Sequence, residues 1–331
     1  MMVDAAVMTP SISIFIVNYN TRDLLEKCLK SIFETRGNLA VEVFVADNNS
    51  TDSSHDMVEV KFPDVSLTTY SRNVGFTSAI NPILPLARGD YYLLIHPDLE
   101  ILPNTLKRFV EFFESHPQAG IVGGNLYYPD GTPNPCEILF PDFKNDLLCF
   151  AWRLLRKLPG GRELVGDYNP LEWSHESTSQ VNWVWNACMM VRREVFEGVG
   201  YFDEDFYVWY ADWDLCKKAT DAGWSVYYLY PATAIHHERH SFAKEDIVGD
   251  EVRYKVDGRY SAPQMIRDRD TFVKKHSGQA SIYGVRIIGI VENALRLSLI
   301  LGDLVFRKAT FKEVSFQLSA CLQTIHTILK A

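Results

Sequence analysis

The sequence predicts an α/β fold in which a mostly parallel central sheet is flanked by helices and followed by an amphipathic helical extension. Over residues 11–128, apolar runs of strand length alternate with helical stretches, at a spacing typical of right-handed βαβ units. The run at residues 91–95 is apolar or aromatic at every position, as expected of a central strand that is covered on both faces.

The first elements follow in chain order. A β-branched run at residues 11–17 leads into a helix that Asn20 caps, whose apolar side chains recur at helical spacing. Strands at 41–46 and 65–70 are each followed by a helix. The second of these helices runs to about residue 87, and its prolines predict a kink.

The later elements are a helix that opens at Pro103, a strand at 120–128 and a strand at 181–191. A helix then begins near Asp212, because acidic residues in a first turn are stabilised by the helix dipole. The last predicted strand starts at Ser225 and runs into a pair of histidines.

Polar side chains stand where the first three strands end, namely Asn18, Tyr19, Asp47, Arg72 and Asn73. Each cluster alone is ordinary turn chemistry. Parallel strands end at one edge of the sheet, however, so together these residues predict a nucleotide-binding edge. The sheet edge has neither a Gly-x-Gly-x-x-Gly nor a Gly-x-x-x-x-Gly-Lys pattern, which leaves a dinucleotide site and a P-loop unsupported.

Two carboxylates, Asp98 and Glu100, follow the strand at 91–95. Mg²⁺ and Mn²⁺ prefer carboxylate oxygens together with phosphate oxygens, so this strand end predicts a divalent cation beside a diphosphate. The alternative is a turn at Asp98 and a solvated Glu100. His236, at the end of the last strand, is either a further metal ligand or an ordinary core or surface residue.

Composition narrows the function classes. The 331 residues carry a net charge of −9 without a lysine or arginine block, which argues against nucleic acid as a partner. The six cysteines are scattered and predict reduced thiols in a cytoplasmic protein. We see no signal peptide pattern and no uncharged apolar stretch long enough to span a membrane.

The stretch from 281 to 331 predicts an amphipathic helical tail. Between Arg286 and Arg307 the polar side chains fall on one stripe at helical period, and a second apolar stripe runs from Phe311 to Leu329. Such wide apolar faces must be buried. They either lie on a membrane surface, or pack on the preceding α/β domain or on a second copy in a homodimer.

Taken in order, the motifs resemble the inverting GT-A glycosyltransferases of family 2, in their bacterial rhamnosyltransferase-like branch. The resemblance covers about residues 11–280. The motifs that carry it are Val17-Asn18-Tyr19-Asn20, Asp47-Asn48-Asn49-Ser50-Thr51-Asp52, Arg72-Asn73-Val74-Gly75-Phe76, His96-Pro97-Asp98, Asn186-Ala187-Cys188-Met189-Met190-Val191-Arg192-Arg193, Gly200-Tyr201-Phe202-Asp203-Glu204, Asp212-Trp213-Asp214-Leu215-Cys216 and His236.

The resemblance implies a GT-A fold with a Rossmann-like sheet and a nucleotide-diphosphate sugar donor, with Asp47 and Asn73 near the base and Asp98 on the metal. It implies that Asp212 is the catalytic base and that His236 contacts the metal or the diphosphate. The implied domain layout is a flexible N-terminus at 1–10, a catalytic domain at 11–280 and a tail at 281–331. Within the catalytic domain, residues 11–128 would bind the nucleotide sugar and 129–280 the acceptor.

Three positions depart from the family pattern. The family usually has Asn-Pro-Asp where this chain has His96-Pro97-Asp98, often has aspartate at the position of Glu100, and has glutamate where this chain has Ala211. The change at Ala211 leaves open whether Asp214 shares the role of base.

The expected reaction is transfer of rhamnose from dTDP-rhamnose to a hydroxyl of a glycan or a polyprenyl-linked saccharide in cell-surface polysaccharide synthesis. It would take place in the cytoplasm or at the inner face of the plasma membrane, with Mg²⁺ or Mn²⁺ as cofactor. A UDP- or GDP-hexose donor, a sugar nucleotidyltransferase and a non-catalytic sugar-nucleotide-binding scaffold are the alternatives.

Overall fold

The computed structural model describes most of the chain and divides it into two compact units. The first unit comprises residues 1–136, 174–207 and 211–242, and the second comprises 137–173, 208–210 and 243–331. The predicted flexible N-terminus lies outside the described residues. The described residues are 12–134, 140–156, 159–160, 176–237, 247–248, 251–252, 255–256, 259–260, 263–305, 321–322 and 324–330.

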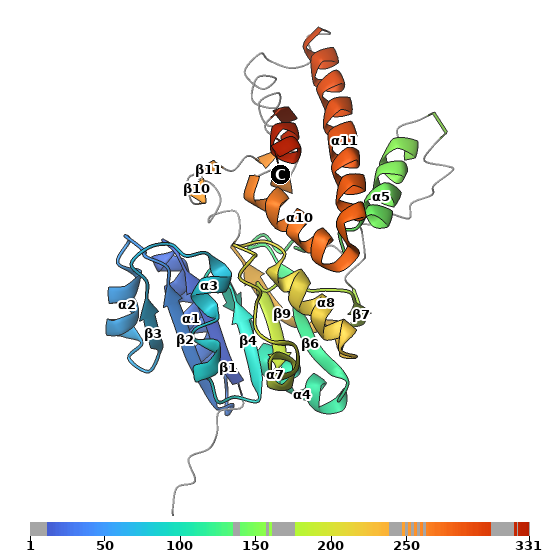
Figure 1. Ribbon diagram of the computed structural model, residues 1–331. Helices are drawn as coiled ribbons and strands as arrows, with labels where there is room; N and C mark the ends of the chain where they lie inside the picture. The colour runs from blue at the N-terminus through green and yellow to red at the C-terminus, as the bar shows by residue number, and fades with distance from the viewer. Residues whose placement is uncertain are drawn as a thin grey trace, which may run out of the picture. The chain divides into compact units, whose positions relative to one another are not determined.

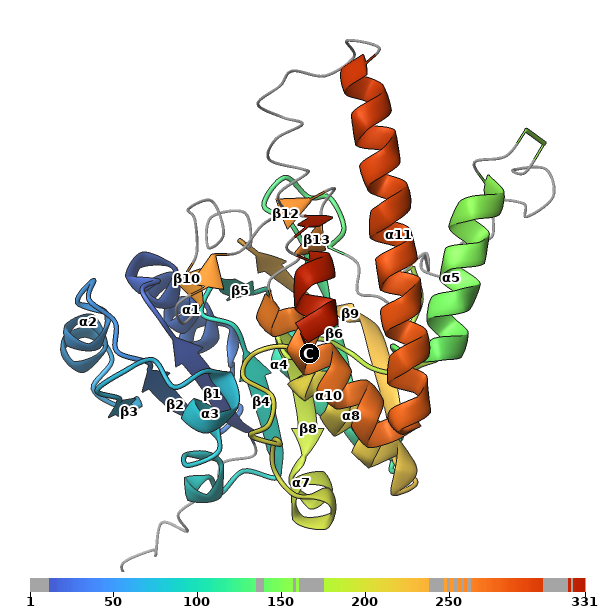
Figure 2. The same cartoon turned by 45° about the horizontal axis from the view of Figure 1, so that its top comes forward.

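The first unit is built on a mixed sheet, of which the described residues form nine strands (Figures 1 and 2). Its strands are β1 (Ile12–Asn18), β2 (Val41–Asp47), β3 (Ser66–Thr69), β4 (Tyr91–Ile95), β5 (Leu99–Ile101), β6 (Ala119–Tyr127), β7 (Ser179–Val181), β8 (Cys188–Arg192) and β9 (Ser225–His236). Its helices are α1 (Arg22–Thr35), α2 (Ser54–Lys61), α3 (Phe76–Ile80), the 3₁₀ turn η1 (Leu84–Leu86), α4 (Thr105–Ser115), α7 (Arg193–Val199) and α8 (Ala211–Asp221).

The strand order is β3-β2-β1-β4-β8-β6-β9-β5, with β7 paired to β9. The predicted βαβ units form its parallel half, β3-β2-β1-β4. β8 then enters antiparallel to both β4 and β6, whereas β6 and β9 run parallel. This order brings the ends of β1, β2 and β4 to one edge of the sheet, as the sequence predicted.

Alternation along the strands sends side chains into two layers. Ile14 and Ile16 of β1 pack into a core that also contains buried residues of α1, α2 and α4. On the other face, the ring of Phe15 contacts that of Tyr92, which in turn meets Phe196 of α7. Helices α3, α7 and α8 lie in front of the sheet in the view of Figure 1. The central strands are therefore buried on both faces, which explains their unbroken apolar runs.

Three local predictions need correction. Asn20 does not cap the first helix, because α1 begins after Thr21 and Asn20 lies before that residue with a left-handed φ of +55°. The strand predicted at 181–191 is two strands, β7 and β8, separated by a loop in which Trp183 and Val184 are buried. The prediction was wrong because the apolar side chains of this loop recur at the same spacing as those of a strand. The helix predicted to run to about residue 87 ends at Ile80, since Pro82 cannot donate the next helical hydrogen bond, and η1 follows it.

The second unit contains α5 (Phe143–Arg156), α10 (Pro263–Ser277), α11 (Gln279–Val305) and two short hairpins. The hairpins pair β10 (Ile247–Val248) with β11 (Glu251–Val252), and β12 (Lys255–Val256) with β13 (Arg259–Tyr260). α11 confirms a long helix in the predicted tail. The predicted stripe residues from 306 to 320 lie outside the described residues. None of the described helices is long and apolar enough to cross a membrane.

Candidate active site

The edge formed by β1 and β2 is held together by a buried polar pair. Asn18 and Asp47 are opposite each other in the β1–β2 register, and Asn18 Nδ2 donates to Asp47 Oδ2 at 2.8 Å. Asn18 is fully buried and its Oδ1 accepts a hydrogen bond from the Thr21 hydroxyl at 2.6 Å. Tyr19, the next residue, is 44% exposed. Asn18 thus holds the strand end in place, whereas Tyr19 presents an aromatic ring to solvent.

The loop that carries Arg72 and Asn73 is clamped by Asn48. Asn48 Nδ2 donates to Asn73 Oδ1 at 2.8 Å, and Asn48 Oδ1 accepts from the Val74 N–H at 2.8 Å. Gly75 follows with a φ of +84°, and a Cβ there would lie 2.7 Å from the Tyr207 carbonyl oxygen. Arg72 itself is exposed. The clamp holds Asn73 against Asn48, which follows Asp47 at the end of β2.

Three side chains gather where β4 and β9 end. His96 follows β4, Asp98 lies two residues later, and His236 is the last residue of β9. One potential ligand atom of each lies within 4.8 Å of those of the other two. Asp98 and His236 are buried, and Asp98 Oδ1 lies 3.4 Å from His236 Nε2.

Both histidines of this group are oriented by asparagines. His96 Nε2 lies 3.1 Å from Asn186 Oδ1, and His236 Nδ1 lies 2.9 Å from Asn134 Nδ2. A metal-ligating histidine characteristically donates the N–H of its second ring nitrogen to an outer acceptor. The Asn186 oxygen can accept from His96 Nε2 in this way, which leaves His96 Nδ1 for a cation. The Asn134 Nδ2 is a donor, so His236 Nδ1 accepts and His236 Nε2 carries the proton that faces Asp98. His96 and Asp98 therefore fit a divalent cation as they stand, and His236 would join them with the Asn134 amide turned to present its oxygen.

Glu100, the other predicted ligand, is not part of this group. It lies in β5, and its Oε1 is 2.8 Å from His237 Nε2. The neighbouring backbone explains the separation, because Leu99 is paired with His236 and Glu100 with Ile235 in the antiparallel register. The structure therefore brings Asp98 and His236 together with His96, and pairs Glu100 with His237.

Asp212 lies in the first turn of α8 and is partly buried. Burial raises the pKa of its carboxyl to about 6, although hydrogen bonds from backbone N–H groups, including those of Asn186 and Trp213, pull it down. The Asn186 N–H reaches Asp212 Oδ2 at 3.3 Å, and the Trp213 N–H reaches Oδ1 at 2.9 Å. A carboxylate with a pKa near neutrality suits proton abstraction.

Asp214 is in a different environment. Its side chain is fully buried, and the Lys218 ammonium lies 3.6 Å from its Oδ2, one helical turn away. A carboxylate without solvent exposure and beside a lysine has an evident structural role in α8. The geometry therefore favours Asp212 over Asp214 as the group that meets a substrate.

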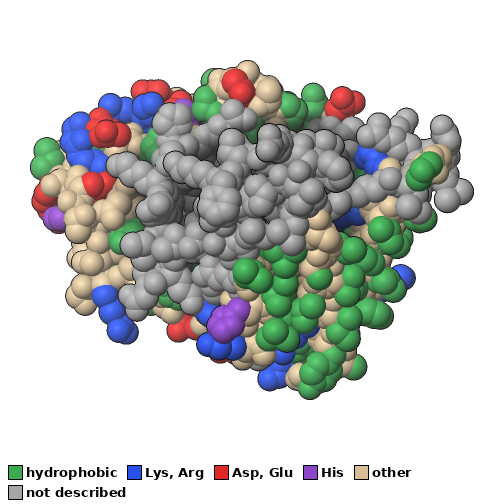
Figure 3. Space-filling model, turned by 90° about the horizontal axis from the view of Figure 1, so that it is seen from above, with side chains coloured by type: hydrophobic (Ala, Val, Ile, Leu, Met, Phe, Trp, Pro, Cys, Tyr) green, Lys and Arg blue, Asp and Glu red, His purple; other side chains and the backbone are tan. Residues whose placement is uncertain are grey.

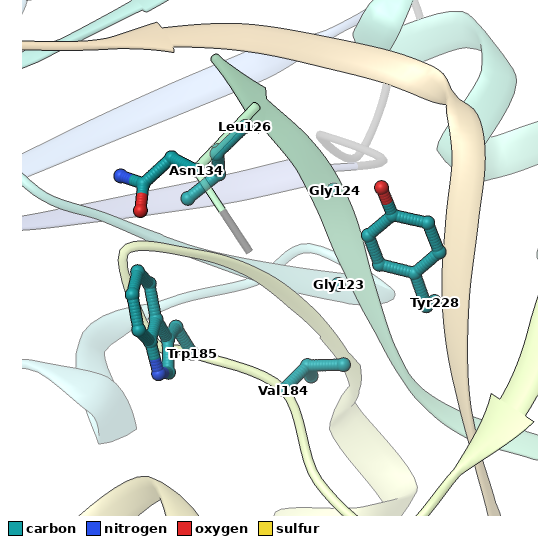
Figure 4. Close-up of a pocket in the computed structure, with 7 residues that line it drawn as sticks. All are labelled: Gly123, Gly124, Leu126, Asn134, Val184, Trp185 and Tyr228. Carbon is teal, nitrogen blue, oxygen red and sulfur yellow. The ribbon is translucent and has the colours of Figure 1, made fainter. Parts of the chain in front are cut away.

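A small cavity lies beside β6, which contributes Gly123, Gly124 and Leu126 to its lining (Figure 4). Its volume is about 10 Å³, and Asn134 and Trp185 contribute to its lining together with Tyr228. That volume accommodates roughly one water molecule and no sugar. Asn134 therefore lies between this cavity and His236, whose Nδ1 it contacts.

His96, Asn134 and Asn186 were missed as site residues. His96 had a usable signal, since it follows the same strand as Asp98 and lies two positions before it. Asn186 opens one of the motifs that carry the resemblance, but its separation of 90 positions from His96 gave no sign of their contact. Asn134 had no signal, because it is 102 positions from His236. Only the fold brings them together.

Residues 13–146 match the family model described as Glycosyl transferase family 2. Over 258 residues the chain is 27% identical to the N-acetylglucosaminyl-diphospho-decaprenol L-rhamnosyltransferase of Mycobacterium tuberculosis, a match that covers 72% of this chain and 80% of that protein. It is 28% identical over 235 residues to the O-antigen biosynthesis protein RfbC of Myxococcus xanthus, covering 70% of this chain and 17% of that protein.

A solved structure is similar in fold. The crystal structure of GalNAc-T7 with UDP, GalNAc and Mn²⁺ matches 81% of this chain with a TM-score of 0.53 at 12% identity. The chain spans about half of that structure, 48% of its length. Together with the family match, this similarity confirms the predicted fold class.

Proposed function

We propose a specific reaction for this chain, which belongs to the glycosyl transferase family 2 and is a glycosyltransferase. It transfers rhamnose from dTDP-rhamnose to a hydroxyl of a lipid-linked saccharide, with inversion at the anomeric carbon. The observation that carries the catalytic part of this proposal is the position of Asn186, whose backbone N–H donates to Asp212 and whose side chain contacts His96. One residue thereby joins the candidate base to the candidate metal group.

The metal group is the proposed place of the donor diphosphate. His96, Asp98 and His236 would hold a divalent cation, Mg²⁺ or Mn²⁺, and Glu100 would support the site through His237. When bound, the cation would offset the negative charge that develops on the leaving nucleoside diphosphate. The nucleotide would lie along the edge made by Asp47, Arg72 and Asn73, with Tyr19 exposed beside it. Asn18 would position Asp47 from below.

Asp212 is the proposed general base. As the acceptor oxygen forms its bond to the anomeric carbon, its proton passes to the Asp212 carboxylate, and the bond from that carbon to the diphosphate oxygen breaks with its electron pair. The Asn186 and Trp213 N–H groups keep the carboxylate oriented. A single displacement inverts the anomeric carbon, and no nucleophile from the protein is required.

The substrates are inferred from relatives. The Mycobacterium tuberculosis relative is named as a rhamnosyltransferase that acts on an N-acetylglucosaminyl-diphospho-decaprenol, which supports both a rhamnose donor and a polyprenyl-linked acceptor for this chain. The test is transfer of labelled rhamnose from dTDP-rhamnose to such an acceptor. The NMR coupling constant at the anomeric carbon of the product then shows whether the configuration has been inverted. Donor consumption without transfer to any lipid-linked saccharide would contradict the acceptor assignment.

We further propose that the C-terminal helices lie on the membrane surface that holds such an acceptor. α11 exposes a row of apolar side chains spaced by four residues, with Tyr283 58% and Ile287 61% exposed. Leu322 and Leu329, later in the chain, are exposed as well. Figure 3 shows hydrophobic side chains gathered in a band on one face, with Lys and Arg side chains at its edges. A helix with one apolar face and charged side chains beside that face suits the interfacial region of a membrane.

Vesicle flotation of the full chain against an Ile287→Asn/Val291→Asn variant tests this location. Because both side chains are exposed, the variant should fold normally and float less. If the variant instead loses a dimer that the unchanged chain forms without vesicles, the face is an oligomerisation surface.

A further inference from the structure

The hairpin of α10 and α11, in the second unit, lines an open cavity of about 340 Å³. Three cationic side chains line it, Arg267, Lys274 and Arg286, along with the carboxylate of Asp270 and the hydroxyl of Thr271. The lining therefore has three positive charges against one negative charge. Cationic donors and a hydroxyl around one cavity are the groups that bind phosphate oxygens.

The helix spacing produces this arrangement. Arg267, Thr271 and Lys274 are four and three residues apart, which places them on one face of α10. The chain then reverses at Gly278, whose φ is +80°, a backbone conformation that glycine adopts without strain. α11 returns beside this face and contributes Arg286 to the same cavity.

The one carboxylate of the lining is already engaged. Asp270 is buried, and its Oδ2 accepts a hydrogen bond from Arg286 Nε at 2.8 Å, while Arg269 Nη2 lies 3.4 Å from its Oδ1. Asp270 thus neutralises part of the positive charge and fixes Arg286. A guanidinium has five N–H donors, and this bond uses only the one on Nε. Lys274 is exposed and has no ion pair with another described residue.

An apolar row begins beside the cationic cavity. Tyr283 lies four residues after Gln279, which also lines the cavity, and three residues before Arg286. The exposed row continues along α11 through Ile287, Val291 and Leu295. A soluble anion would contact only the cationic part. An anion that carries a hydrocarbon chain would contact both, with its phosphate in the cavity and its chain along the row.

We propose that this cavity binds the phosphate group of a membrane lipid. The proposal rests on the membrane location proposed above and names the residues that would recognise the lipid. Arg267, Lys274 and Arg286 would donate to the phosphate oxygens, and the Thr271 hydroxyl would donate as well. Diffuse attraction to a charged surface would not depend on the residues of this cavity. Substitutions inside and outside the cavity therefore distinguish phosphate recognition from diffuse attraction.

The test uses the full chain and two kinds of phosphatidylcholine vesicle. One contains phosphatidic acid, and the other contains oleate in the amount that gives the same surface charge. Lys274→Gln is compared with Lys275→Gln, a matched change at an exposed neighbour that does not line the cavity. We expect Lys274→Gln to weaken phosphatidate binding by at least about tenfold, and Arg267→Gln/Lys274→Gln to weaken it further, since a hydrogen bond to a charged group contributes about 1.5–3 kcal/mol. Lys275→Gln should lose no more than the diffuse attraction of one basic residue to an anionic surface, about fivefold.

Binding to oleate vesicles should be equally weak in all variants. Equal losses in Lys274→Gln and Lys275→Gln would overturn the proposal in favour of surface charge alone. Calorimetry with inorganic phosphate, without divalent cations, tests whether the cavity instead binds a soluble phosphate. Tight phosphate binding that is lost in Arg267→Gln/Lys274→Gln, without vesicle binding, would overturn the lipid assignment. Donor turnover is measured in parallel and should be unchanged in these variants. A turnover failure in the unchanged chain would count against the proposed function and not against this site.

Discussion

The backbone N–H of Asn186 donates to Asp212 Oδ2 at 3.3 Å, and the same residue places its side-chain oxygen 3.1 Å from His96 Nε2. The candidate base and the candidate metal group are therefore positioned by a single residue in the loop before β8. This arrangement explains why the carboxylate at 212 and the histidine at 96 should be tested together.

Replacing the base should stop turnover without preventing donor binding. We expect Asp212→Asn to lose roughly 10²–10⁴ in kcat, the usual contribution of general base catalysis, while the affinity for the donor stays nearly unchanged. Asp214→Asn is the comparison, and it should lower the thermal midpoint but leave the folded enzyme active, because Asp214 is buried beside Lys218. An inactive Asp214→Asn beside an active Asp212→Asn would reverse the assignment.

The rate should depend on pH through Asp212. Its carboxyl accepts a proton only when ionised, and burial raises its pKa to about 6. The rate should therefore be steady above about pH 7 and fall about tenfold per unit below about pH 6. The affinity for Mn²⁺ is measured over the same range as a control. If Mn²⁺ affinity falls in parallel with the rate, loss of metal and not protonation of Asp212 accounts for the acid limb.

The metal group should respond in a graded way to substitution. Asp98→Ala should nearly abolish Mn²⁺-dependent binding of a nucleoside diphosphate. His96→Asn, which restores the residue usual in the family, should weaken Mn²⁺ binding by about tenfold or more, and Glu100→Ala should have a smaller effect. Calorimetric titration of the nucleoside diphosphate with and without Mn²⁺ measures its metal-dependent binding. Electron paramagnetic resonance of Mn²⁺ without nucleotide measures binding of the metal itself. Metal-independent binding that survives in Asp98→Ala would remove Asp98 from the site.

The donor should be a dTDP-linked 6-deoxy sugar. A panel of dTDP-, UDP- and GDP-linked sugars, followed by release of the nucleoside diphosphate, should show the highest kcat/KM for dTDP-rhamnose. Asp212→Asn serves as the background for spontaneous hydrolysis. A clear preference for a UDP-sugar would replace the rhamnose assignment while leaving the family and fold in place.

Gly75 should be required for the loop that carries Arg72 and Asn73. Gly75→Ala places a Cβ 2.7 Å from the Tyr207 carbonyl oxygen and retains a φ of +84°, so the free energy of unfolding should fall by about 1–3 kcal/mol. Gly131→Ala is the matched control, because its φ is +80° with open space around the added carbon. Only Gly75→Ala should also weaken nucleotide binding. Equal effects of both substitutions would show that backbone strain alone is responsible.

The strands and helices of the parallel half of the sheet were predicted from residue patterns within short stretches of the sequence. The alternation of strands and helices places β1, β2 and β4 with their ends at one edge, and for this reason the residue pattern by itself identifies Asp47 and Asp98 as site candidates. The pattern did not predict that β8 would enter antiparallel between β4 and β6. The apolar side chains of a strand indicate that it is buried, and a buried strand has the same pattern whether it runs parallel or antiparallel to its neighbours.

What the sequence alone determined is the α/β class, the strand ends, and the candidates Asp98, His236 and Asp212. Only the tertiary structure decided which of these share a site. It grouped His96 with Asp98 and His236, paired Glu100 with His237, and separated the buried Asp214 from the partly exposed Asp212. The physical reason is that a ligand set and a raised pKa depend on distances and burial between strand ends far apart in the chain. Those quantities arise only when the sheet is assembled.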